Sequence, residues 1–121
     1  MNIQEQVVGS VTDFIKAGDT NDIALLDRVL HKNFQNVQDG FFEEEGIFVF
    51  SKDEYRKLVE TRRFGGVART LDVKRVDVEG NMAHVHVQLK SKFLMFNSLL
   101  TLCREGGRWW VLHNMPTIVK K

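Results

Sequence analysis

The sequence has little of several features that mark particular classes of protein. Its 121 residues contain one cysteine, Cys103, which excludes an internal disulfide and any multi-cysteine metal site. No stretch approaches the roughly 20 apolar residues of a membrane span, and the first residues lack the basic end and apolar run of a signal peptide. Seventeen Lys and Arg stand against sixteen Asp and Glu, so the net charge of +1 gives no basic field for nucleic acid. We therefore expect a cytoplasmic protein that binds neither nucleic acid nor a membrane.

Recognisable catalytic motifs are missing as well. There is no phosphate-binding glycine loop, no nucleophile motif and no metal-ligand cluster, so neither a cofactor nor a metal is expected. The length fits a single domain over residues 1–121. Nine Phe and two Trp supply large side chains for a core or for the wall of a pocket.

Alternation of apolar and polar residues dominates the second half of the chain. Residues 71–117 are predicted to form four long strands in succession, an antiparallel meander. In the first of these strands the apolar residues change face at Lys74–Arg75, which predicts a β-bulge. A half-buried sheet needs a cover, and only the segments before residue 64 can provide it.

Helical spacing occurs three times before residue 64. The first predicted helix begins at Ile3 and stops at Gly18, the second spans residues 22–30, and Ser51 with Glu54 forms a capping box that opens the third. Between the second and third helices, residues 34–38 and 46–50 are predicted as short strands, with a turn at Asp39–Gly40. The predicted fold class is α+β, with three N-terminal helices packed in the concave side of a curved, bulged, mostly antiparallel sheet.

This order of elements, closing on residues 107–111 (Gly-Arg-Trp-Trp-Val), resembles the nuclear transport factor 2-like superfamily with its cystatin-like, cone-shaped fold. The likeness spans nearly the whole chain, and residues 19–34 resemble the family's link between the first helices and the first strand. Within the superfamily the chain is most similar to the putative lumazine-binding and polyketide-cyclase-like branches, many of whose members have no established reaction. The resemblance also implies a homodimer through the outer face of the sheet.

Ketosteroid isomerases of this superfamily allow a comparison residue by residue. In them a Tyr on the first helix and a protonated Asp in the sheet donate to the substrate oxyanion, while a second Asp takes the proton. By this resemblance Asp39 falls at the position of the base, but Phe14 replaces the Tyr and Thr101 replaces the sheet Asp. A lone carboxylate without oxyanion donors is a poor catalyst. Asp39 before Gly40 also fits a simple turn residue.

Three histidines form a polar group in the predicted sheet. His84 and His86 are two residues apart on one strand, so both project from the same face, and His113 on the last strand is the natural third member. Such a set can chelate a metal. Gln88 and Lys90 on the same face instead favour a surface that is solvated or paired with a second subunit.

The central predicted strand carries sparse polar groups on an apolar wall, as small-molecule pockets do. These polar residues are Asn97 and Thr101, and either side chain could equally be satisfied by a hydrogen bond to a neighbouring backbone group. If the cone is a binding site, the first helix, the third helix and this strand supply its walls. The sequence leaves open which face of the sheet lines the pocket. The predicted ligand-binding residues are Phe14, Tyr55, Met95, Asn97, Thr101 and Trp110.

Two functions from different classes follow from these residues. The preferred one is a binding or accessory protein that holds a small apolar or aromatic ligand in the cone, without a reaction. The alternative is a lyase, isomerase or cyclase in which Asp39 or His113 acts as general base.

Overall fold

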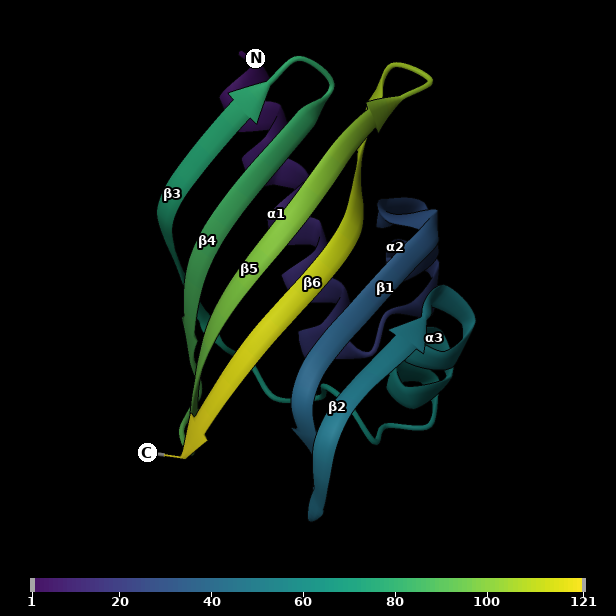
Figure 1. The fold of residues 1–121 in the computed structure, drawn as a ribbon, viewed down its shortest axis with the longest axis vertical. Helices are drawn as coiled ribbons and strands as arrows, with labels where there is room; N and C mark the ends of the chain where they lie inside the picture. The colour runs from purple at the N-terminus through teal and green to yellow at the C-terminus, as the bar shows by residue number, and fades with distance from the viewer. Residues whose placement is uncertain (1, 121) are drawn as a thin grey trace.

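Six strands form one curved sheet, and three helices cover one of its faces (Figure 1). The computed structural model describes residues 2–120, apart from the side chain of Lys120. The strand order is β2-β1-β6-β5-β4-β3, and all neighbours are antiparallel except β1 and β6. The predicted α+β architecture is confirmed. The elements are α1 (Ile3–Thr20), α2 (Ile23–Val29), β1 (Leu30–Phe41), β2 (Glu44–Ser51), α3 (Lys52–Glu60), β3 (Thr70–Glu79), β4 (Met82–Lys90), β5 (Leu94–Glu105) and β6 (Arg108–Lys120).

The helices begin and end at capping residues, and α1 does not end at the glycine predicted to stop it. The capping box is confirmed, because the Ser51 side chain accepts from the Glu54 backbone and the Glu54 side chain accepts from the Ser51 backbone. The predicted stop of α1 at Gly18 is wrong. The helix continues to Thr20 and ends at Asn21, which adopts the left-handed conformation with φ 51°. Gly18 is buried inside the helix, where a later loop packs against it.

Two sequence expectations about the strands have different outcomes. The predicted bulge is confirmed, since the register between β3 and β4 shifts between Val73 and Arg75. The predicted turn at Asp39–Gly40 is wrong. β1 runs through both residues to Phe41, and Gly40, with φ 88°, lies at a register irregularity inside the strand. A glycine absorbs such a kink at little cost, which is why turn chemistry and bulge chemistry look alike in sequence.

The core lies between the helices and the inner face of the sheet. In this core, the apolar face of α1 packs against alternate residues of β4 and β5, as the amphipathic patterns predict. No helix among residues 2–120 is long and apolar enough to cross a membrane. The fully buried residues of this contact include Val7, Val11, Val85, Val87, Leu100 and Leu102.

β1 and β6 separate part-way along their length. They pair as far as Asn36 and Asn114, after which β1 continues with β2 alone and β6 with β5 alone, and Figure 1 shows their ends diverging. Pro116 follows on β6, where it pairs with Ser98 of β5 and has no N–H to donate toward β1. Ile118, on the inner face, is 47% exposed, so solvent reaches that face here. We call this part of the inner face, from Asn36 and Asn114 to Ile118, the cone mouth.

Candidate functional site

Three carboxamide side chains form a hydrogen-bonded chain on the inner face at the cone mouth. Asn114 Nδ2 donates to Asn36 Oδ1 at 2.8 Å, and Asn36 Nδ2 donates to Gln38 Oε1 at 2.8 Å. Gln38 Nε2 then donates to the carbonyl oxygen of Gly40 at 2.9 Å. Asn36, Gln38 and Asn114 are only 1%, 7% and 6% exposed. We call these three residues the carboxamide chain; its internal bonds are what make such polar groups tolerable in the core.

Aromatic rings line the inner face beside the carboxamide chain. Phe50 and Phe48 of β2 lie directly across from Asn36 and Gln38 of β1. Phe64, from the loop after α3, lies at the centre of the group and is surrounded by four other rings. Its ring centroid is 5.7 Å from that of Tyr55, 5.9 Å from Phe41, 6.0 Å from Phe50 and 6.1 Å from Phe42. We call Phe41, Phe42, Phe50, Tyr55 and Phe64 the aromatic wall.

The loop that carries Phe64 is fixed to the end of α1. Asn21 Nδ2 donates to the carbonyl oxygens of Val59 at 2.8 Å and Phe64 at 3.0 Å. Gly66 N donates to the carbonyl oxygen of Gly18 at 3.0 Å. A Cβ on Gly65 would lie 2.1 Å from that same carbonyl oxygen, so only glycine fits. Phe64 is therefore held in place by backbone contacts.

An ion pair and a phenol are further polar groups on the helix side of the sheet. Arg69 Nε donates to Asp19 Oδ1 at 2.6 Å, and both side chains are less than one-fifth exposed. The Arg69 guanidinium lies 4.9 Å from the centroid of the Phe96 ring. Burial raises the pKa of Tyr55 to about 12, with Arg69 lowering and Asp19 raising it by smaller amounts. Tyr55 is thus a protonated hydrogen-bond donor at neutral pH.

The structure does not bring the six predicted ligand-binding residues together. Phe14 and Tyr55 lie against the inner face, with ring centroids 6.0 Å apart. On β5, Met95, Asn97 and Thr101 alternate with the buried inner residues and lie on the outer face, each opposite a polar residue of β4. Trp110 is also outside, under the guanidinium of Arg108. A ligand-binding role for any of the six stays a prediction.

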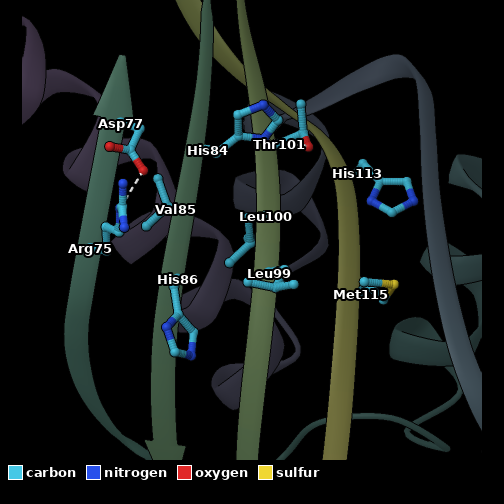
Figure 2. A pocket seen from close by; sticks show the side chains of 10 residues that line it. All are labelled: Arg75, Asp77, His84, Val85, His86, Leu99, Leu100, Thr101, His113 and Met115. Atoms are coloured by element: carbon cyan, nitrogen blue, oxygen red, sulfur yellow. Dashed lines mark hydrogen bonds and ion pairs between the residues drawn. The ribbon is translucent and has the colours of Figure 1, made fainter.

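The two predicted general bases also lie on the outer face. Asp39 is exposed beside Ile47 of β2. His113 borders a shallow hollow of about 480 Å³ together with His84 and His86, and Figure 2 shows these side chains on the side of the sheet away from the helices. Thr101 lies between His84 and His113 in the strand order. A base from this pair could act only on a molecule bound outside the cone.

A second polar cluster consists of His31, Cys103 and Glu105, whose ligand atoms lie within 4.8 Å of one another. The backbone N–H of Asn33 donates to His31 Nδ1 at 3.0 Å, so the proton is on Nε2, which donates to Glu105 at 2.9 Å. A metal on Nε2 would force the proton onto Nδ1, against the Asn33 N–H. Burial, then Glu105, raises the pKa of the Cys103 thiol, which opposes a thiolate ligand or nucleophile. The cluster fits a structural link between β1 and the β5–β6 turn.

Sequence reasoning missed the carboxamide chain, although part of its signal was available. Asn36 and Gln38 follow the core residue Phe34 at alternate positions, so they share its face. Asn114 gave no such signal, because the register of β5 and β6 shifts between Thr101 and Leu102 and resets which residues of β6 face inward. A polar residue in an alternating strand is ordinarily assigned to solvent.

Comparison with known proteins adds the family. The sequence profile of a family described as "Putative lumazine-binding" matches residues 2–115. The chain belongs to this family. The resemblance drawn from the sequence is thereby confirmed. No curated protein matches the chain.

Solved structures similar to this member of the putative lumazine-binding family share its nuclear transport factor 2-like fold. One from Silicibacter pomeroyi, of unknown function, has a TM-score of 0.83 at 20% identity, covering 98% of this chain and 100% of that one. One from Shewanella baltica, also of unknown function, has a TM-score of 0.83 at 13% identity over 100% and 98%. A putative ketosteroid isomerase from Parabacteroides distasonis has a TM-score of 0.71 at 16% identity over 98% and 89%. At these identities the likeness shows the fold alone.

Proposed function

We propose that this chain binds a small, planar, largely apolar or aromatic molecule at the cone mouth and does not transform it. The observation that carries the proposal is the meeting of the aromatic wall with the buried carboxamide chain at the point where β1 and β6 separate. Aromatic side chains supply contact area for a flat ring. A few fixed polar groups on an apolar wall then set the orientation of the ligand.

Binding is favoured over catalysis by the protonation states at the mouth. A general base must be unprotonated near neutral pH and within reach of the substrate proton. The carboxamide chain does not titrate in this range. Tyr55 has its pKa raised to about 12, and Asp19 is committed to Arg69 through both the side chain and the backbone N–H. Among the described residues this region offers donors and acceptors but no free base.

The family description supplies the first molecule to test. Lumazine is a planar bicyclic ring with ring N–H and carbonyl groups, so its shape suits the aromatic wall and its edges suit carboxamides. The family's name makes lumazine a reasonable probe for this chain, and the aromatic wall beside the carboxamide chain is the physical argument for it.

The experiment is a titration of lumazine into the protein, followed by the fluorescence of the ligand. We expect saturable binding that weakens by about tenfold or more in Phe64→Leu, which keeps an apolar side chain but removes the central ring of the aromatic wall. The matched control is Phe93→Leu, at a Phe that is 66% exposed in the β4–β5 turn. No binding, or equal losses in the two variants, would contradict the proposal.

We also propose that the outer face of the sheet pairs with a second copy of the chain. The strand register pairs Val49 of β2 with Val37 of β1, and Met115 of β6 with Leu99 of β5. Val37 and Met115 come directly after Asn36 and Asn114, the last residues at which β1 and β6 pair, so we treat the four apolar residues as one apolar row. Three of them are exposed large apolar residues, at 51%, 41% and 49% for Val49, Met115 and Leu99. A two-fold axis through this row would bring apolar side chains against their equivalents.

Polar rows flank the apolar row on both sides, as in an interface with an apolar centre and a polar rim. On one side run His113, Thr101 and His84, and on the other Thr117, Asn97 and Gln88. The hollow shown in Figure 2 lies on this face.

A further inference from the structure

The direction of the carboxamide chain is fixed by a single backbone group. The nitrogen and oxygen of a carboxamide have nearly the same shape, so their assignment depends on the hydrogen-bond network. The carbonyl of Gly40 can only accept, and therefore Gln38 must present its nitrogen to it. The oxygen of Gln38 then faces Asn36, which must present its own nitrogen.

The same reasoning extends to the inner end of the chain. Asn36 has its nitrogen on Gln38, so its oxygen faces Asn114, and Asn114 must donate. Asn114 Oδ1 is left over as the terminal acceptor. This oxygen is buried and accepts no hydrogen bond from the described residues, and the whole of Asn114 is only 6% exposed. A buried acceptor without a donor is destabilising, and a bound molecule that supplies one removes that penalty.

From this geometry we infer that the ligand of the cone mouth presents a neutral N–H or O–H donor to Asn114 Oδ1, so that the site selects planar lactams over their N-alkylated forms. The inference rests on the proposed function and adds to it the chemical class of the ligand. A purely apolar ring would leave the buried oxygen without a donor. A carboxylate would set a second acceptor against it.

A lactam also matches the donor that Asn114 retains. One of the two N–H groups of Asn114 is used by Asn36, and its other N–H makes no hydrogen bond among the described residues. A lactam edge carries N–H and C=O side by side, the complement of a carboxamide edge. The aromatic wall, in which Phe50 lies across from Asn36, is placed to contact the face of the same ring.

The experiment compares lumazine with 1,3-dimethyllumazine, in which both ring N–H groups are N-methyl. We expect the wild-type protein to bind lumazine about tenfold or more tightly than the dimethyl compound. In Asn114→Leu, which keeps the side-chain volume, the ratio should fall close to one; a merely steric penalty on the methyl groups would persist. Asn97→Leu, on the outer face, should keep the wild-type ratio.

The outcomes separate the inference from the function on which it rests. Equal binding of the two compounds by the wild-type protein would overturn the inference, assigning Asn114 Oδ1 to internal hydration, while leaving a planar-ligand site in place. Binding of neither compound would overturn both. If Asn114→Leu does not fold, as judged by circular dichroism, a wild-type ratio near one still overturns the inference.

Discussion

Asn114 donates a 2.8 Å hydrogen bond to Asn36 at the last position where β1 and β6 are paired. This bond joins two strands that run parallel up to that point and then diverge. The bond lies among buried polar groups, whereas Ile118, further along the inner face of β6, is 47% exposed. Core structure and candidate site therefore share the same residues.

Replacement of Asn36 by Leu should destabilise the fold by about 1–3 kcal/mol, because it leaves Asn114 Nδ2 and Gln38 Oε1 buried without partners. Urea denaturation measures the loss. The matched control is Asn97→Leu, whose partner Gln88 is 3.4 Å away on the outer face, and we expect a change within about 0.5 kcal/mol. Equal losses in both variants would show that the inner network contributes no more to the free energy of unfolding than the Asn97–Gln88 contact on the outer face.

Tyr55 should titrate late and by itself, because it is the single tyrosine of the chain. Its pKa is raised by burial to about 12, against about 10 in an unfolded chain. The folded state thus holds the phenol proton more tightly, so this contribution to stability is complete below pH of about 10 and is lost as pH rises toward 12. Tyrosinate absorbance measures the midpoint; a midpoint near 10 in the folded protein would contradict the burial of this hydroxyl.

Gly65→Ala should cost far more than Gly80→Ala. Both glycines have positive φ, 79° and 60°, so both substitutions carry a conformational cost of about 1 kcal/mol. Only at Gly65 would the new Cβ meet backbone, 2.1 Å from the carbonyl oxygen of Gly18, whereas nothing lies within 4 Å at Gly80. Thermal unfolding of the two variants gives the difference. Similar melting temperatures would mean that the loop carrying Phe64 is not fixed to α1.

Leu99→Glu should convert the proposed dimer to a monomer, since it places a charge in the apolar row of both copies. Light scattering should give twice 14.0 kDa for the wild type and 14.0 kDa for the variant. Lys92→Glu, in the β4–β5 turn, is the control and should stay dimeric. A wild-type monomer at micromolar concentration would overturn the proposal.

Much of the fold followed from local patterns that act independently of tertiary context. The capping box of Ser51 and Glu54 is a local hydrogen-bond arrangement. The bulge near Lys74 showed because Val73 and Val76 must both face the core, which a regular strand does not allow.

The candidate site was less accessible because its signals depend on which face is inside. β5 has apolar residues on both faces, so Asn97 and Thr101 could be assigned to the cone by pattern alone. Asn36 and Gln38 are buried by pairing with each other, which is a property of the folded structure. Helix propensity alone likewise could not show that the backbone carbonyl of Gly18 lies so close to Gly65 that no Cβ fits at Gly65.

The most direct measurement of the central claim is the set of side-chain amide signals in a nitrogen–proton NMR spectrum during addition of lumazine. We expect the signals of Asn36, Gln38 and Asn114 to shift in a saturable way, because these carboxamides lie at the cone mouth. The amides of Gln88 and Asn97, on the outer face, should not move. Shifts confined to Gln88 and Asn97, with the carboxamide chain unchanged, would contradict a ligand site inside the cone.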